Sequence, residues 1–348
     1  MKTETLPLKQ RWQAFKDSNP QTRIRDAAAE LGVTEAELLA TGVGSRVVRL
    51  EGDWTELIKA LPGLGPVMCL TRNEAAVHER RGRFEKIEFS RETGLVTGSD
   101  IDLRLFMKHW KFGFAVTDSI AGGERHSFQF FNAHGDAVHK VYLEPEGDAG
   151  IFRNLANRFT APDQTGGFPV APRPAPPAEQ PDKEIDVDGF RAAWINLQDT
   201  HEFHPLLRAF GVGRKQALRL APKGHAIAIP VASVRRMLEA ASERHLPIMV
   251  FIGNPGCLQI HTGQVSNIKM FKEEWLNVLD PEFNMHLRLP LVAATWIVRK
   301  PTRDGIVTAL EIHDTHGDAI ALFFGKRKPG QPEDERWRAL CDELEEGV

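Results

Sequence analysis

The sequence predicts an α+β protein with an internal duplication. Each half is expected to have an N-terminal helical segment followed by a large antiparallel sheet, and the two halves are expected to pack together. Three observations support this prediction: two stretches recur at a nearly constant offset, a proline-rich segment separates the copies, and helical and strand-like patterns follow in the same order in each half. A chain of 348 residues also fits about two domains better than one core.

The repeat is visible in two pairs of stretches. Residues 61–87 (LPGLGPVMCLTRNEAAVHERRGRFEKI) align with residues 244–268 (RHLPIMVFIGNPGCLQIHTGQVSNI) at an offset of 181. Residues 126–143 (HSFQFFNAHGDAVHKVYL) align with residues 308–325 (TALEIHDTHGDAIALFFG) at an offset of 182, and both contain the tetrapeptide HGDA. Because apolar positions also align between these matches, we interpret them as a duplication, with a period too long for a solenoid.

A linker is expected between the copies. Residues 161–183 (APDQTGGFPVAPRPAPPAEQPDK) are rich in Pro, Ala and Gly and lack hydrophobic periodicity, which is typical of an exposed, semi-extended segment. The chain is therefore divided into an N-terminal repeat over residues 1–160, the linker, and a C-terminal repeat over residues 184–348.

Each repeat is expected to begin with helices and to continue with strands. In TRIRDAAAELGVTEAELLAT, Thr34 is followed three residues later by Glu37, which is a capping box, and the second repeat has HEFHPLLRAFGVGRKQALRL at this place. Runs of β-branched and aromatic residues predict strands, among them PVMCLTRN, IMVFIGN, LVAATWIVRK, TALEIHD and AIALFFG. HGDA and HTGQ predict hairpin turns, and hairpin spacing favours antiparallel sheets over βαβ units.

Composition argues against several classes of protein. The net charge of −3 does not indicate a protein whose main role is to bind a phosphate backbone. Cys69, Cys257 and Cys341 are too few for a disulfide framework and are expected to be buried small hydrophobes. No apolar run reaches transmembrane length, and the first residues, MKTETLPLKQRWQAF, lack a signal-peptide core. We therefore expect a cytoplasmic protein without stable membrane insertion.

The stretch QDTHEFH, residues 198–204, raises the question of a metal site. A helix is expected over residues 194–209, which would place His201 and His204 on adjacent parts of one face. A zincin helix requires HExxH, and this segment is one residue short and has no third ligand at a recognisable spacing. Two interpretations stay open: exposed helix histidines, or an imidazole that ligates the iron of a large cofactor lying against the helix.

A haem site would also need cations for its propionates and apolar walls. Arg214 follows the glycine turn after the histidine helix, Lys300 lies in VRKPTRDG at the end of a strand, and Phe251 in MVFIGN could line a cavity. Arg104 alternates with leucines in DLRLF, so it points away from its apolar neighbours. It either reaches solvent or lines a cavity, where it could hydrogen-bond a sixth iron ligand.

Two further motifs give weaker signals. His78, in NEAAVHERRGRF, precedes a hairpin-like turn and aligns with Gln259, so a surface histidine is expected. RDAAAELGVTEAELLA has the pattern of a helix–turn–helix DNA reader. Its second helix carries Glu35 and Glu37 and has no basic residue before Arg46, so repulsion by phosphates argues against binding in a DNA groove.

Several ordered motifs point to one family. The chain contains, in order, NEAAVHE…G, DLRLF…W, THxFH, IMVFIGNPGCLQIHTG, WLNVLDPEFNMHL, WxxRKPTxDG and LExxxxxG. In this it resembles the bacterial cytoplasmic haem-trafficking and haem-degrading proteins of the HemS type, the hemin-degrading factors, from about residue 20 to residue 340. The resemblance implies a duplicated α+β protein with two large antiparallel sheets and one haem between the C-terminal helices and the sheet region.

The resemblance also implies roles for individual residues. His201 matches the family's proximal iron ligand, and His204 would be a nearby alternative. Arg104 matches the family's distal arginine, which would be the catalytic group in an enzyme of haem breakdown. The other matches are propionate contacts at Arg214 and Lys300, an aromatic wall at Phe251 and a secondary haem position at His78. The chain departs from some relatives, which have Gln and Tyr, by carrying Leu322 and Phe324.

Two functions remain open at this point. The protein could be a haem carrier without turnover, or an enzyme that degrades haem oxidatively and releases its iron. Because the sequence has no flavin or nicotinamide fingerprint, such an enzyme would need an external reductant. Expected partners are haem itself and an inner-membrane haem importer, a haem oxygenase or a reductase; nucleic acid is not expected.

Overall fold

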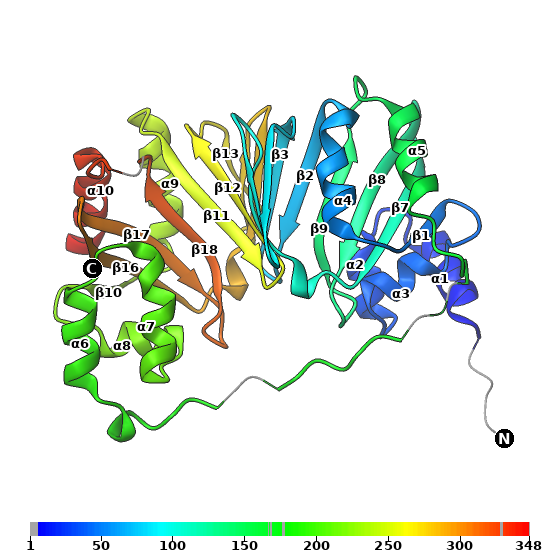
Figure 1. Cartoon of the computed structure of the whole chain (residues 1–348). Helices are drawn as coiled ribbons and strands as arrows, with labels where there is room; N and C mark the ends of the chain where they lie inside the picture. Colours follow the sequence, from blue (N-terminus) through cyan, green and yellow to red (C-terminus); the bar gives the residue numbers. More distant parts are fainter. Residues whose placement is uncertain (1–5, 166, 168, 176–177, 328–329, 348) are drawn as a thin grey trace. The chain divides into compact units, whose positions relative to one another are not determined.

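The chain forms two compact units, seen here in a computed structural model (Figure 1). The structure describes residues 6–165, 167, 169–175, 178–327 and 330–347. Unit 1 contains residues 1–72, 79–174 and 254–259, and unit 2 contains residues 73–78, 175–253 and 260–348. Among the described residues, the strands belong to two antiparallel sheets of nine strands each, which confirms the α+β class. No described helix is both long and apolar enough to cross a bilayer.

Unit 1 is built from the first repeat. Its helices are α1 (Leu8–Ser18), α2 (Ile24–Glu30), α3 (Glu35–Ala40), α4 (Trp54–Ala60) and α5 (Ala149–Arg158). One run of antiparallel strands, in the order β1 (Val47–Leu50), β7 (Phe112–Ile120), β8 (Gly123–Phe131), β9 (Ala137–Leu143) and β2 (Val67–Arg72), forms its main sheet. A second run contains β4 (Lys86–Ser90), β5 (Thr93–Thr97) and β6 (Asp102–Phe106).

Unit 2 repeats this plan. Its helices are α6 (Val187–Ile195), α7 (Phe203–Phe210), α8 (Arg214–Leu220), α9 (Ser233–Glu243) and α10 (Glu335–Glu346). Its main run of strands is β10 (Ala226–Ile229), β16 (Ala294–Thr302), β17 (Gly305–His313), β18 (Ala319–Gly325) and β11 (Ile248–Asn254). Its second run is β13 (Ile268–Phe271), β14 (Trp275–Leu279) and β15 (Phe283–Arg288), while β3 (Ala76–Gly82) and β12 (Cys257–Gly263) divide between the units.

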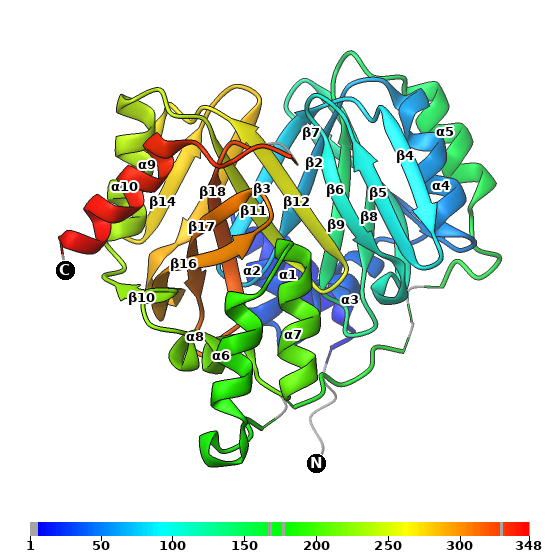
Figure 2. The same cartoon turned by 60° about the vertical axis from the view of Figure 1, so that its left-hand side comes forward.

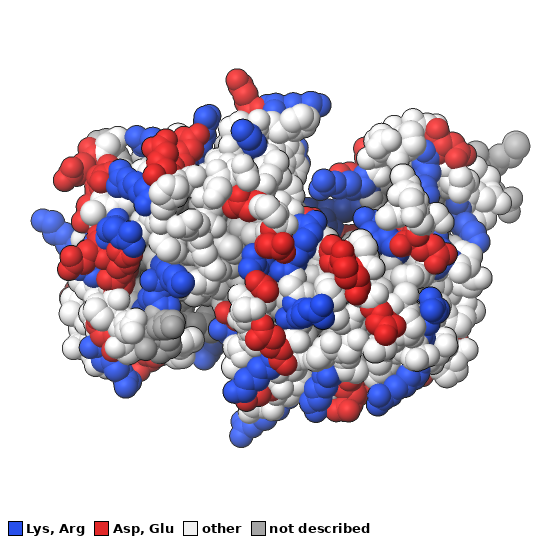
Figure 3. Space-filling view, turned by 90° about the horizontal axis from the view of Figure 1, so that it is seen from above, with Lys and Arg blue, Asp and Glu red and all other residues white. Residues whose placement is uncertain are grey.

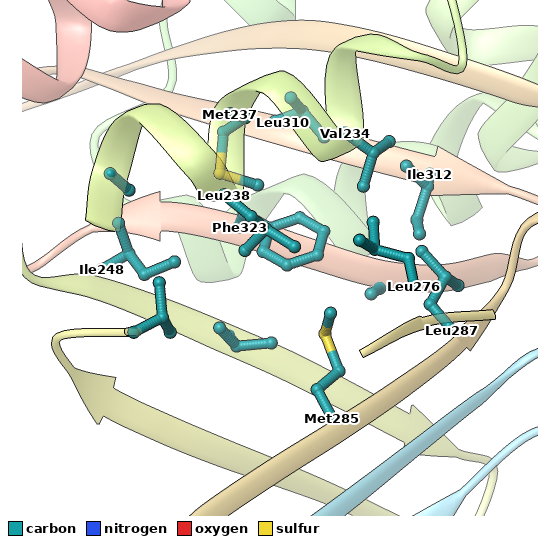
Figure 4. Close-up of a cluster of buried hydrophobic side chains, with 14 of the residues drawn as sticks. Val234, Met237, Leu238, Ile248, Leu276, Met285, Leu287, Leu310, Ile312 and Phe323 are labelled. Atoms are coloured by element: carbon teal, nitrogen blue, oxygen red, sulfur yellow. The ribbon is translucent and has the colours of Figure 1, made fainter. Parts of the chain in front are cut away.

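Helices cover both faces of the main sheet in unit 2. One face packs against α9 and α10 in a dense core that includes Met237, Leu310, Ile312 and Phe323 (Figure 4). The other face packs against α6, α7 and α8, and Ala309 lies in that second core (Figure 2). Because neighbouring residues of a strand point to opposite faces, Leu310 and Ala309 belong to different cores. Odd-numbered residues of β17 therefore face the α6–α8 layer.

Unit 1 shows the same two-sided arrangement. Ala115 of β7 lies in a core with residues of α4 and α5, whereas its neighbours Phe114 and Val116 pack with α3. The sequence predicted helices before each sheet but not α4, α5, α9 and α10. These helices cover the second face, which would otherwise expose apolar side chains to water.

Hydrogen bonds repeat with the sequence. In unit 2, the Asn73 side chain accepts from the backbone N–H groups of Ala75 and Ala76 and donates to the carbonyls of Gly253 and Ile320. In unit 1, Asn254 makes the same four kinds of bond, with Gly256, Cys257, Arg72 and Val138. Two asparagines at the offset of 181 thus perform one structural task, which explains why this position is shared between the repeats.

The predicted hairpin turns have different outcomes. HGDA connects β8 to β9 and β17 to β18, where Gly135 and Gly317 have φ of 75° and 88°, so both turn predictions are confirmed. HTGQ is not a hairpin turn, because its first three residues belong to β12. His261 in this segment is buried and stacks on Phe283, with ring centroids 3.9 Å apart, which favours the extended strand.

The cysteines are buried as predicted, and a 3-10 turn, Asp182–Glu184, begins at the end of the predicted linker. Residues 161–181 contain no helix or strand among those described, while residues 166, 168, 176 and 177 of the predicted linker lie outside the described residues. Unit 1 holds the linker at Gln164, whose side chain bonds the backbone of Arg49. The three cysteines are buried, and burial raises the pKa of the Cys257 thiol to about 12.

Candidate functional site

His201 lies on a short 3-10 turn, not inside a long helix. The turn spans Thr200–Glu202 and leads directly into α7, whereas α6 ends at Ile195. The predicted helix over residues 194–209 is therefore wrong. The break has a physical cause in a second capping box, because the Asp199 side chain accepts from the His201 N–H while Glu202 accepts from the Asp199 N–H.

The same aspartate orients the His201 ring. His201 Nδ1 lies 2.6 Å from Asp199 Oδ1, and 93% of the histidine side chain is exposed. Hydrogen bonds from His201 lower the pKa of Asp199, so its carboxylate is ionised at neutral pH. A carboxylate that accepts from Nδ1–H directs the lone pair to Nε2, which is the arrangement of a metal-ligating histidine with its supporting group.

His204 is placed differently. It lies in the first turn of α7 on the exposed side, while the intervening Phe203 is buried. Partial burial, together with the positive charges of Arg208 and Arg214, lowers the pKa of His204. A neutral imidazole can ligate a metal ion. Among the described residues, however, no carboxylate is hydrogen-bonded to the His204 ring, whereas Asp199 is bonded to the ring of His201.

The predicted cations of unit 2 meet at Phe203. The Lys300 ammonium lies 4.3 Å from the centre of the Phe203 ring, and the Arg214 guanidinium lies 5.5 Å from it. Lys300 belongs to β16 and faces the α6–α8 layer, as its neighbour Val298 does. The structure therefore brings Arg214 and Lys300 to the helix that follows His201.

Glu311, which the sequence analysis did not single out, joins these cations. Arg214 donates from Nε and Nη2 to its two carboxylate oxygens at 3.0 and 2.7 Å, and Lys300 Nζ donates to Oε1 at 2.9 Å. Glu311 is completely buried, and His313 Nε2 lies 3.4 Å from its Oε2. Its only sequence signal is its position between Leu310 and Ile312, which turns it away from their core.

Charge explains the state of this cluster. Burial alone raises the pKa of Glu311, but the nearby positive charges of Arg214 and Lys300 hold it well below its usual range. Burial lowers the pKa of Lys300, and Glu311 offsets part of this effect. The cluster thus contains a buried carboxylate held in its ionised form by two cations.

Phe251 lies on the same face of the sheet. It alternates along β11 with the core residues Val250 and Ile252 and is half-buried. Its ring meets that of Phe324 at 5.1 Å, edge to face, and Phe324 packs against the α6–α8 layer. Phe324 thus places a second aromatic ring beside the residue that was predicted to form an apolar wall.

The two remaining predicted residues have different surroundings. Arg104 of β6 belongs to unit 1, is partly exposed and pairs with Asp102, while Leu103 and Leu105 are buried, as their alternation predicted. His78 is completely buried in β3, with its ring 4.9 Å from that of Phe283. The expectation of a surface histidine is therefore wrong, because the segment continues as a strand where a turn was expected.

The helix–turn–helix pattern also has a structural explanation. α2 and α3 form as expected, with the Thr34–Glu37 capping box in place. Glu35 on the second helix is buried against Arg72 and Lys140, so this helix packs into unit 1 through its acidic residue.

On the face seen in Figure 3, basic and acidic side chains are intermixed. Within the described ranges, no three His, Cys, Asp or Glu side chains gather as a metal-binding group.

Fold and side chains together define a class: an internally duplicated α+β protein with a carboxylate-supported histidine near a cation cluster. This set of groups fits a ligand that carries both a metal and carboxylates. The chain belongs to the HemS family, because a family model described as "Haemin-degrading HemS.ChuX domain" matches residues 32–159 and 211–344. Those ranges include Arg104, Arg214, Phe251 and Lys300, and His201 lies just outside them.

Similar proteins extend over nearly the whole chain. The hemin transport protein HemS of Yersinia enterocolitica is 37% identical over 327 residues, which is 93% of each chain. The structure of holo-PhuS, a heme-binding protein from Pseudomonas aeruginosa, shares 46% identity, with a TM-score of 0.94 and coverage of 97% of this chain and 98% of that one. ChuS, described as an E. coli heme oxygenase, shares 33% identity, with a TM-score of 0.87 and coverage of 97% and 99%.

Proposed function

We propose that this chain binds haem in unit 2 with His201 as the iron ligand, and that it traffics the haem and/or degrades it oxidatively to release iron. One observation carries the proposal: the exposed His201 ring is held at Nδ1 by Asp199 and lies two residues before Phe203, which two cations contact. The similarity to hemin transport and heme-binding proteins supports the choice of ligand.

The residues fit the chemistry of haem. Asp199 fixes the His201 tautomer, so Nε2 is free to bind iron. Arg214 and Lys300 supply positive charge for a propionate, and Phe251 supplies an apolar surface for the macrocycle. His204 would be a second ligand during transfer. His78 would contact haem at a secondary position only after the strand around it opens, because its ring is buried in this structure.

Arg104 would be the distal group, as the family resemblance implies. Its pairing with Asp102 orients the guanidinium, and its partial exposure leaves N–H donors for a small ligand. Bound haem supplies an iron centre able to react with oxygen. Arg104 would contribute hydrogen bonds and positive charge to a small ligand of the iron.

Degradation is the second candidate function, and the similarity to the E. coli heme oxygenase ChuS favours it. The chain would then depend on an external electron donor, such as a reductase. An inner-membrane haem importer would supply the haem, and a separate haem oxygenase would receive it if this chain acts only as a carrier.

The proposal is tested by adding hemin to the purified apoprotein and recording the absorption spectrum. We expect a shifted Soret band at one haem per chain, and a spectrum identical to free hemin would refute haem binding. A reductant is then added in air, with catalase present to remove peroxide. Loss of the Soret band with an open tetrapyrrole and free iron would support degradation; a persistent band would support the carrier.

A further inference from the structure

Glu311 leaves one edge of Arg214 unused. A guanidinium can hold two carboxylates, one at its Nε–Nη2 edge and one at its Nη1–Nη2 edge. Glu311 occupies the first edge through bonds from Nε and Nη2. Among the described residues, no side chain or carbonyl accepts a hydrogen bond from Nη1, and 26% of the arginine side chain is exposed. The second edge is therefore available to a ligand from outside.

The charges of the cluster are also incomplete. Arg214 and Lys300 carry two positive charges and Glu311 carries one negative charge, while His313 adds no further anion. One positive charge is left over at a site where it is partly shielded from water. A single carboxylate at the open edge would balance it, whereas a neutral group would not.

We propose that Glu311 is a positioning residue for carboxylate recognition: it fixes Arg214 so that the Nη1–Nη2 edge presents a site for one carboxylate. This inference rests on the proposed function, in which that carboxylate is a haem propionate. The inference adds a role for Glu311 to the proposed function. This buried acid would not contact the ligand itself, but it would orient Arg214, which does. Lysine at position 214 could not serve both carboxylates in this way, because an ammonium has no planar pair of edges.

Unit 1 provides a matched control. Glu35 is likewise a buried carboxylate that bridges one arginine, Arg72, and one lysine, Lys140. Glu35 belongs to the other unit and is not among the residues proposed to contact haem. Glu35→Gln therefore removes the same kind of buried charge as Glu311→Gln without touching Arg214.

The experiment compares hemin with hemin dimethyl ester, in which both carboxylates are blocked. Affinities are measured by Soret titration for the wild type, Glu311→Gln, Arg214→Lys and Glu35→Gln. We expect the wild type to bind hemin more tightly than the ester, by about tenfold or more, the usual effect of hydrogen bonds to a charged group. Glu311→Gln and Arg214→Lys should reduce this ratio toward one by weakening hemin binding alone. Glu35→Gln should keep the wild-type ratio.

The possible failures are distinguishable. If the wild type binds neither compound, the proposed function fails and the inference with it. If the wild type prefers hemin and Glu311→Gln keeps that preference, haem binding stands and the role of Glu311 is refuted. If Glu311→Gln does not fold, the Arg214→Lys variant tests the proposal instead. It is expected to fold, because residue 214 is partly exposed and lysine keeps the positive charge. An unchanged ratio in Arg214→Lys would refute the use of two edges.

Discussion

Replacing Glu35 by Gln should lower the free energy of unfolding by about 3 kcal/mol at neutral pH. Burial alone raises the pKa of Glu35, but the charges of Lys140 and Arg72 and a hydrogen bond from Lys140 lower it from 4.5 to about 2. A difference of this size between the folded and unfolded chain corresponds to about 3 kcal/mol. The usual cost of removing one partner of a buried ion pair has the same magnitude.

The sign of the pH dependence follows from the depressed pKa. The stabilisation by Glu35 is fully present above pH 4.5, the pKa of the unfolded chain, and is lost as the pH falls toward 2. Glutamine does not titrate in this range. The wild type should therefore lose its advantage over Glu35→Gln between these two pH values.

Urea unfolding followed by tryptophan fluorescence measures this difference at pH 7, 4 and 2.5. The control is Glu88→Gln, which removes an exposed carboxylate paired with Lys86 and should change stability by less than about 0.5 kcal/mol. If the deficit of Glu35→Gln is below about 1 kcal/mol at pH 7, or is the same at pH 7 and pH 2.5, the buried ion pair does not stabilise unit 1 as argued.

The other predictions concern the proposed haem site. His201→Ala should shift the Soret band and weaken hemin binding at least tenfold, while His204→Ala should have a much smaller effect; equal effects would mean that both rings share the iron. Asp199→Ala should weaken hemin binding about tenfold or more, as expected when the supporting partner of a ligating histidine is lost, and an unchanged titration would remove Asp199 from that role. Arg104→Ala should alter the bands that report the sixth ligand and any degradation rate without lowering the unfolding midpoint, and an unchanged spectrum and rate would exclude it from the site.

Local patterns predicted the elements that depend on neighbouring residues. The Thr34–Glu37 capping box and the HGDA turns have their bonding partners within a few residues, so their sequence signal is sufficient. The Asp199–Glu202 box carries the same kind of signal and was overlooked because the histidine spacing suggested one continuous helix. α9 and α10 were not predicted for another reason. They pack on a sheet face that forms only when strands distant in the sequence pair.

The cation cluster could not be predicted in this way, because its members lie far apart in the sequence. Glu311 and Arg214 are 97 residues apart, and Lys300 reaches Glu311 only through the pairing of β16 with β17. Strand alternation gives the face on which each side chain lies, but not which charges meet there. The sequence analysis therefore gave Arg214 and Lys300 as candidate cations, and the family resemblance supported them, but neither indicated the acid between them.

The two repeats differ at the position of Glu311, although both form the same kind of sheet. At the offset of 182, Gln129 takes the place of Glu311, and its side chain donates to Ser127. The first repeat thus has a buried neutral amide where the second repeat has a buried carboxylate. Since both sheets form with either residue, the fold does not require an acid at position 311, and its charge is better explained by the cations that it orients.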